Sequence, residues 1–200
     1  MRSSIQGRSR TTGFSLIEVL VALVVLSFGL LGMVGMQAMA LQNNREARLQ
    51  SVAVDLAREL AEMMRGNKDV SMLATANPYV GNFSGTALAP ATKSSCLSVG
   101  SNCSDTTEVA RAEITEWLAR VETNLPGARV TICPDSAPYN PAGLPQWACT
   151  SNAATDVMVV KIGWSRMSTN ASAATQDRVI RANDDSQPGV ILTVTAGSTT

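Results

Sequence analysis

The sequence lacks histidine altogether, and only 16% of its 200 residues are charged. Without histidine, the chain cannot carry Ser-His-Asp or Cys-His catalysis, a histidine-ligated zinc site or a histidine pH switch. Its 16 basic and 16 acidic residues cancel, so no overall positive charge favours an anionic partner. We therefore expect no nucleic acid among the partners of this protein.

The motifs of other catalytic sites are missing as well. No glycine-rich phosphate loop follows a predicted strand, and the sequence contains no G-x-S-x-G or S-x-x-K motif. Asp105, Asp184 and Asp185 are candidate metal ligands by charge, but isolated acidic residues in polar loops are usually solvated turn residues. The sequence therefore predicts a protein that is not an enzyme and that binds no metal or other cofactor.

The N-terminus combines a basic leader with a long apolar segment. Residues 1–13 contain three arginines and no acidic residue, and no charged residue occurs from 19 to 44. As a helix, the 18 residues from 19 to 36 would rise about 27 Å, close to the hydrocarbon thickness of a bilayer. Two simple interpretations are a secretory signal peptide cleaved near residues 38–40 and a plain membrane anchor.

The residues at the start of the apolar segment favour neither simple interpretation. The leader ends in Gly13 and is followed directly by Phe14-Ser15-Leu16-Ile17-Glu18. An ionisable residue in a membrane segment is costly and is expected to have a partner. Because a plain anchor has no use for such a carboxylate, Glu18 indicates a specific contact.

With these residues the sequence resembles the type IV pilin superfamily. The resemblance covers residues 8–65 and consists of the basic leader, Gly13 followed by Phe14, Glu18 at the fifth position after that junction, and the apolar helix. The continuation SLIEVLVALVVLSFGLLGMVGMQ is most similar to PilV-type minor pilins, the type IV pilus modification proteins. Many major pilins have a proline near Gly35, and this chain departs from that pattern.

The resemblance implies a maturation pathway. A prepilin peptidase on the cytoplasmic side would cut between Gly13 and Phe14, and the new amine of Phe14 would be methylated. During assembly, Glu18 would meet the Phe14 amine of a neighbouring subunit. Two alternatives stay open: an internal pair with the amine of the same chain, which lies about one helical turn away, and a carboxylate that merely lies at headgroup level near a helix N-terminus.

The resemblance also implies a location and a function. The protein would be a single-pass inner-membrane protein with a periplasmic head, later incorporated into a type IV pilus at the cell surface. As a minor pilin it would help to initiate assembly with other minor pilins, the major pilin and a tip adhesin-like protein, in support of twitching motility and cell adhesion. The alternatives are a minor pseudopilin of a type II secretion system and a membrane-anchored binding module that never enters a filament.

The helix is expected to continue past the membrane. Apolar residues spaced by three and four define one stripe: Leu49, Val52, Ala53, Leu56, Leu60, Met63 and Met64. We expect a helix over 14–65, with about 14–41 in the membrane or filament core and the rest packed on a head domain of residues 66–200. An independent coiled coil is the alternative for this stripe, but fewer than three clean heptads are present.

The head is predicted to be α+β, with an antiparallel sheet, as the pilin resemblance also implies. After a Ser- and Gly-rich connection over 67–105, Asp105 is expected to cap a helix that Pro126-Gly127 stops. Strands are expected at 128–133, 156–164, 176–182 and 190–195. Residues 157–160 are continuously apolar, which is typical of a central strand covered on both faces.

Four cysteines are expected to cross-link this head. In an exported domain, Cys96, Cys103, Cys133 and Cys149 are first interpreted as two disulfides. Three pairings are possible, and the sequential one is favoured because each bond then closes a local loop rich in turn residues. A zinc site is the alternative, although neither spacing is the short one that zinc knuckles use.

The loop between the last two cysteines carries two aromatic residues. Tyr139 and Trp147 lie among four prolines, which stiffen the loop. Exposed aromatic side chains on a stiff loop are suited to contact a partner. The alternative is that they cover the sheet.

Overall fold

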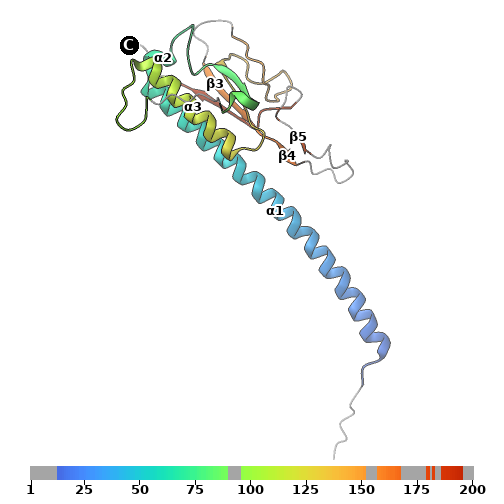
Figure 1. The fold of residues 1–200 in the computed structure, drawn as a ribbon. Coiled ribbons are helices and arrows are strands. Elements are labelled where there is room, and N and C mark those ends of the chain that lie inside the picture. The colour runs from blue at the N-terminus through green and yellow to red at the C-terminus, as the bar shows by residue number, and fades with distance from the viewer. Residues whose placement is uncertain are drawn as a thin grey trace, which may run out of the picture. The chain divides into compact units, whose positions relative to one another are not determined.

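The computed structural model describes residues 13–89, 96–151, 157–167, 179–180, 182 and 186–195. The elements follow in the order α1 (Leu16–Gly66), α2 (Lys68–Ser71), β1 (Gly81–Ser84), η1 (Gly85–Ala87), α3 (Thr106–Asn124), β2 (Arg129–Pro134), β3 (Met158–Gly163), β4 (Arg166–Met167), β5 (Val179–Ile180) and β6 (Val190–Val194) (Figure 1). The leader up to residue 12 and the pair Asp184-Asp185 lie outside the described residues.

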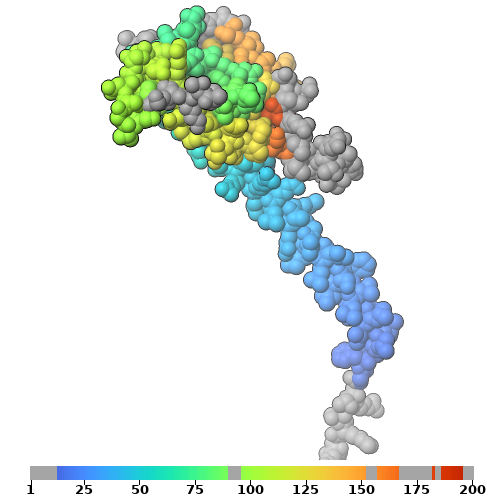
Figure 2. All heavy atoms as spheres, viewed as in Figure 1, coloured from blue at the N-terminus to red at the C-terminus, as the bar shows by residue number. Residues whose placement is uncertain are grey.

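The chain divides into two units, Met1–Arg45 and Glu46–Thr200. In the first unit every residue from Gly13 to Leu41 is exposed, and Figure 2 draws this part in blue. The large apolar side chains among them are 46–83% exposed. An 18-residue window of α1 has a mean hydropathy of 2.6 with none of it buried, so this helix is long and apolar enough to cross a membrane.

The second unit is an α+β domain whose core lies between two helices and a sheet. The end of α1 and α3 run side by side over one face of the sheet (Figure 1). The buried α1 residues are Ala53, Leu56, Ala57, Leu60, Ala61 and Met64, which follow the predicted stripe. The indole of Trp117 on α3 is fully buried and donates a 2.9 Å hydrogen bond to the carbonyl oxygen of Leu56. This contact fixes α3 against α1.

The main sheet is antiparallel, with strand order β1-β2-β3-β6. In β3, Val160 and Ile162 belong to the core under the helices, whereas Val159 and Lys161 alternate with them and face the other side. Val159 and Val160 are 1% and 0% exposed. The prediction of a central strand covered on both faces is therefore confirmed for β3.

The head helix and three of the four strands match their predicted positions. The Asp105 carboxylate caps α3 by accepting a 2.8 Å hydrogen bond from the Glu108 amide. The fourth segment, 176–182, is described at residues 179–180 and 182, and its residues 179–180 form β5, which pairs with β4 in a separate two-stranded sheet.

The connection over 67–105 holds more structure than the sequence predicts, because it contains α2, β1 and η1. Tyr79 is fully buried, and its hydroxyl donates a 2.7 Å hydrogen bond to the Glu113 carboxylate on α3. The side-chain amide of Asn67 donates to the Thr106 carbonyl oxygen at 2.8 Å. These contacts hold the described part of the connection against α3.

Candidate functional site

The junction between Gly13 and Phe14 lies in non-helical backbone immediately before α1. The carbonyl oxygen of Ser15 accepts hydrogen bonds from the amides of Glu18 at 3.0 Å and Val19 at 3.3 Å, which starts the helix. The Phe14 side chain is 83% exposed, and no atom outside the immediate neighbours lies within 4 Å of a Cβ built on Gly13. Both residues of this junction are thus exposed.

Glu18 lies in the first turn of α1 and is exposed. The partial positive charge of a helix N-terminus favours a carboxylate at this position. Among the described residues, no side chain forms an ion pair or hydrogen bond with this carboxylate. Gly35, where many major pilins have proline, lies inside the continuous helix.

In the head, the structure joins Cys96 to Cys103 and Cys133 to Cys149, the sequential pairing. Among the described residues, no group of three or more histidine, cysteine, aspartate or glutamate side chains is placed to hold a metal ion. Asp105 is used as the helix cap, and the hydrogen bond from the Glu108 amide lowers the pKa of its carboxyl.

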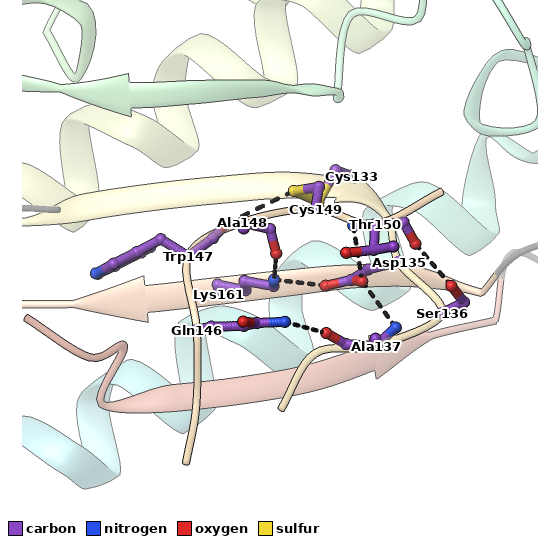
Figure 3. Close-up of polar contacts among 10 residues, drawn as sticks. All are labelled: Cys133, Asp135, Ser136, Ala137, Gln146, Trp147, Ala148, Cys149, Thr150 and Lys161. Atoms are coloured by element: carbon purple, nitrogen blue, oxygen red, sulfur yellow. Dashed lines mark hydrogen bonds and ion pairs between the residues drawn. A yellow bond between two sulfur atoms is a disulfide. The ribbon is translucent and has the colours of Figure 1, made fainter. Parts of the chain in front are cut away.

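The second disulfide closes a loop that covers the outer face of the sheet, and we call residues 134–151 the lid loop (Figure 3). Beneath it, the ammonium of Lys161 lies 2.5 Å from Oδ2 of Asp135, and both side chains are 0% exposed. The ammonium also donates a 2.6 Å hydrogen bond to the carbonyl oxygen of Ala148. Both partners of this buried charge thus belong to the lid loop.

Asp135 also ties the two arms of the lid loop together. Its Oδ1 accepts hydrogen bonds from the amides of Ala137 at 2.9 Å and Thr150 at 3.1 Å. Burial alone would raise the pKa of the Asp135 carboxyl, but the hydrogen bonds from Lys161 and the two amides outweigh it and lower that pKa. The carboxylate is therefore held in its charged form.

Trp147 covers the sheet, whereas Tyr139 is exposed. Trp147 is only 7% exposed, and Tyr139 is 51% exposed. The guanidinium of Arg129 lies 4.4 Å from the centroid of the Trp147 ring, which is the geometry of a cation–π contact. Of the two interpretations left open for these aromatic residues, the covering one therefore holds for Trp147, because its ring packs on the sheet beside Gly163.

A groove of about 650 Å³ lies between β1 and the lid loop. Its polar lining includes Asn82, Arg129, Thr131 and Gln146. Oδ1 of Asn82 accepts hydrogen bonds from Thr131 at 3.2 Å and from Nε of Arg129 at 3.4 Å. These hydrogen bonds hold the side chains of Asn82, Arg129 and Thr131 in place. They give the groove a fixed polar surface and do not form a set of reacting groups.

Two family models match the chain. Residues 8–34 match the prokaryotic N-terminal methylation motif, and residues 35–115 match the model described as type IV pilin Tt1218. The first match contains the Gly13–Phe14 junction and Glu18, and the second ends within α3. No curated protein and no solved structure matches the chain.

Proposed function

The chain is a member of the type IV pilin superfamily, and from this premise we propose that it is a minor pilin of a type IV pilus. Membership alone makes it a pilin or a pseudopilin, anchored in a membrane by α1. The family is structural rather than enzymatic. What is proposed is the minor role, the specific partners, and the path from the inner membrane to the pilus.

The observation that carries the proposal is the position of three residues at the start of the exposed apolar helix. Gly13 and Phe14 lie in open, non-helical backbone, and Glu18 follows in the first helical turn. A prepilin peptidase cuts between Gly13 and Phe14, and the released amine of Phe14 is methylated. The chain is then the substrate of two modifications.

The charges explain how assembly follows from this maturation. A carboxylate in lipid is costly, and an opposite charge in a low-dielectric environment relieves that cost. The Phe14 amine of a neighbouring subunit supplies this charge to Glu18 and sets the axial register. The exposed apolar side chains of 14–41 move at the same time from lipid to contacts with other pilin helices.

The minor role is supported by the likeness of the segment after Phe14 to PilV-type minor pilins. In that role the protein primes assembly with other minor pilins and the major pilin, and helps to place an adhesin-like protein at the tip. A head with two disulfides suits the oxidising periplasm and cell surface. A minor pseudopilin of a type II secretion system and a membrane-anchored module outside any filament are the alternative functions.

The proposal predicts the mature N-terminus. Mass spectrometry of the protein from cells should find a chain that begins at Phe14 and carries one methyl group on its amine. Gly13→Leu should leave the precursor uncut, because a bulky side chain then occupies the residue before the scissile bond. The matched control is Gly7→Leu, which makes the same change within the leader and should leave processing intact.

Three results distinguish the candidate functions. Functional protein that still begins at Met1 contradicts maturation as a pilin and favours the membrane-anchored module. Processed protein that is recovered from sheared pili supports the pilus assignment. Processed protein that instead stays in the cell envelope and is required for protein secretion identifies a pseudopilin.

A further inference from the structure

The lid loop and Lys161 depend on each other. Lys161 lies in the interior strand β3, opposite Thr131 of β2 and Ile191 of β6, on the face away from the helices. Its ammonium is fully buried and contacts Asp135 and Ala148, near the two ends of the lid loop (Figure 3). If the lid loop lifts, a buried charge loses both contacts and meets water.

Noncovalent contacts also hold the lid loop: the Asp135 amide donates to the carbonyl oxygen of Val157 at 3.0 Å, and the amides of Ala137 and Thr150 donate to the Asp135 carboxylate. The amide and hydroxyl of Ser136 both donate to the Thr150 carbonyl oxygen, at 2.8 Å and 2.7 Å. Trp147 packs over Gly163, where a Cβ would lie 2.8 Å from its ring. A buried ion pair adds little net stability, because the cost of removing two charges from water offsets their attraction.

We propose that the Cys133–Cys149 disulfide is a latch on the lid loop, so that the amine of Lys161 becomes accessible to acylating reagents only when this bond is reduced. The disulfide joins the residue just before the lid loop to a residue near its end. Such a cross-link limits the freedom that the open loop would gain. Once it is reduced, noncovalent contacts remain to oppose opening: the Lys161 contacts, the hydrogen bonds between the two arms of the lid loop and the packing of Trp147.

The lysine content of the chain makes this proposal directly testable. The sequence contains three lysines, Lys68, Lys93 and Lys161, and Lys68 is half-buried on the short helix α2. The full-length protein in detergent is treated with an N-hydroxysuccinimide ester of acetic acid, before and after reduction. Peptide mass spectrometry then gives the acetylation rate at each lysine, with Lys68 as the internal reference.

Two double variants separate the two disulfides. In Cys133→Ser/Cys149→Ser, acetylation of Lys161 relative to Lys68 should rise about tenfold or more, because a local opening now exposes the amine. In the matched control Cys96→Ser/Cys103→Ser, Lys161 should stay protected, since that bond closes a different loop. Reduction of the unaltered protein should reproduce the first result.

Hydrogen exchange shows whether opening is confined to the lid loop. The latch requires that amides of β2 and β3 keep their protection in Cys133→Ser/Cys149→Ser while Lys161 becomes reactive. If Lys161 stays protected there, the noncovalent contacts close the lid loop and the proposal is wrong. If the β2 and β3 amides lose protection together with Lys161, the disulfide stabilises the whole head, and the proposal is equally wrong.

Discussion

Lys161 is a charged residue in the middle of an apolar strand, and Asp135 explains why it is tolerated there. Both side chains are fully buried and their charged atoms are 2.5 Å apart. Replacing such a pair by apolar residues is often neutral, whereas removing one partner leaves an uncompensated buried charge. The pair therefore matters chiefly when it is broken.

Asp135→Asn should destabilise the head by about 3–5 kcal/mol at pH 7, because it leaves the Lys161 ammonium without its counter-charge. The folded head lowers the pKa of the Asp135 carboxyl, so its stabilising effect is fully present above the unfolded value of about 3.9 and is lost as pH falls through the folded value. The difference between unaltered protein and variant should shrink below about pH 4. Chemical denaturation at pH 7 and pH 3 measures both effects.

The surface pair of Asp55 and Arg58 provides the control. Its atoms are 3.9 Å apart and both side chains are 71% exposed, so Asp55→Asn should change the free energy of unfolding by less than about 1 kcal/mol. An Asp135→Asn variant as stable as this control would show that the buried ammonium finds another partner.

This pair was not predictable from the sequence. The run from 157 to 160 predicts a buried strand, but the lysine that follows it has both of its partners in the lid loop. The pattern of apolar residues in a strand does not show which side chains of the lid loop will cover that strand. Trp147 illustrates the same limit, because the composition of the loop did not decide whether its ring is exposed or covers the sheet.

At the scale of elements, β3 and the lid loop meet at Gly163. A Cβ on this residue would lie 2.8 Å and 2.9 Å from two carbons of the Trp147 ring. The backbone angle of Gly163 is not one that requires glycine, so the close approach of the ring is the constraint. Glycine here lets the lid loop lie directly on the strand.

Gly163→Ala should therefore displace Trp147 and destabilise the head by about 1–3 kcal/mol, the usual cost of overpacking. Chemical denaturation measures the loss, and a changed tryptophan fluorescence spectrum should report the displaced ring. Gly66→Ala is the matched control, because nothing lies within 4 Å of its Cβ. Equal stability of the two variants would mean that Trp147 moves without cost.

The elements with a clear period or cap were predictable, and the short ones were not. An apolar stripe predicted α1, an aspartate cap predicted the start of α3, and a continuous apolar run predicted β3. β1 has four residues, with Phe83 as its one large apolar side chain, so it carries too little pattern to detect. β4 and β5 have two residues each, and their pairing depends on tertiary structure.

At the scale of the whole molecule, the chain combines a folded head with a helical segment whose described apolar side chains are not buried in a core. The described part of Met1–Arg45 exposes large apolar side chains from Phe14 to Leu41, whereas the apolar side chains of the head form a buried core. Exposed apolar surface of this extent indicates a membrane or protein contact. In a pilin both occur, first in the bilayer and then in the filament.

The proposed contact of Glu18 makes assembly, rather than folding, sensitive to this residue. Glu18→Ala should leave the head intact, because residue 18 lies in the other unit. It should reduce the amount of protein in sheared pili about tenfold or more, since the variant leaves a neighbour's Phe14 amine unpaired and tenfold corresponds to about 1.4 kcal/mol. Glu62→Ala, on the same helix but exposed within the head unit, is the control and should assemble normally. Normal incorporation of Glu18→Ala, measured against total cellular protein, would mean that the carboxylate has no role in docking and that the apolar contacts alone set the position of the subunit.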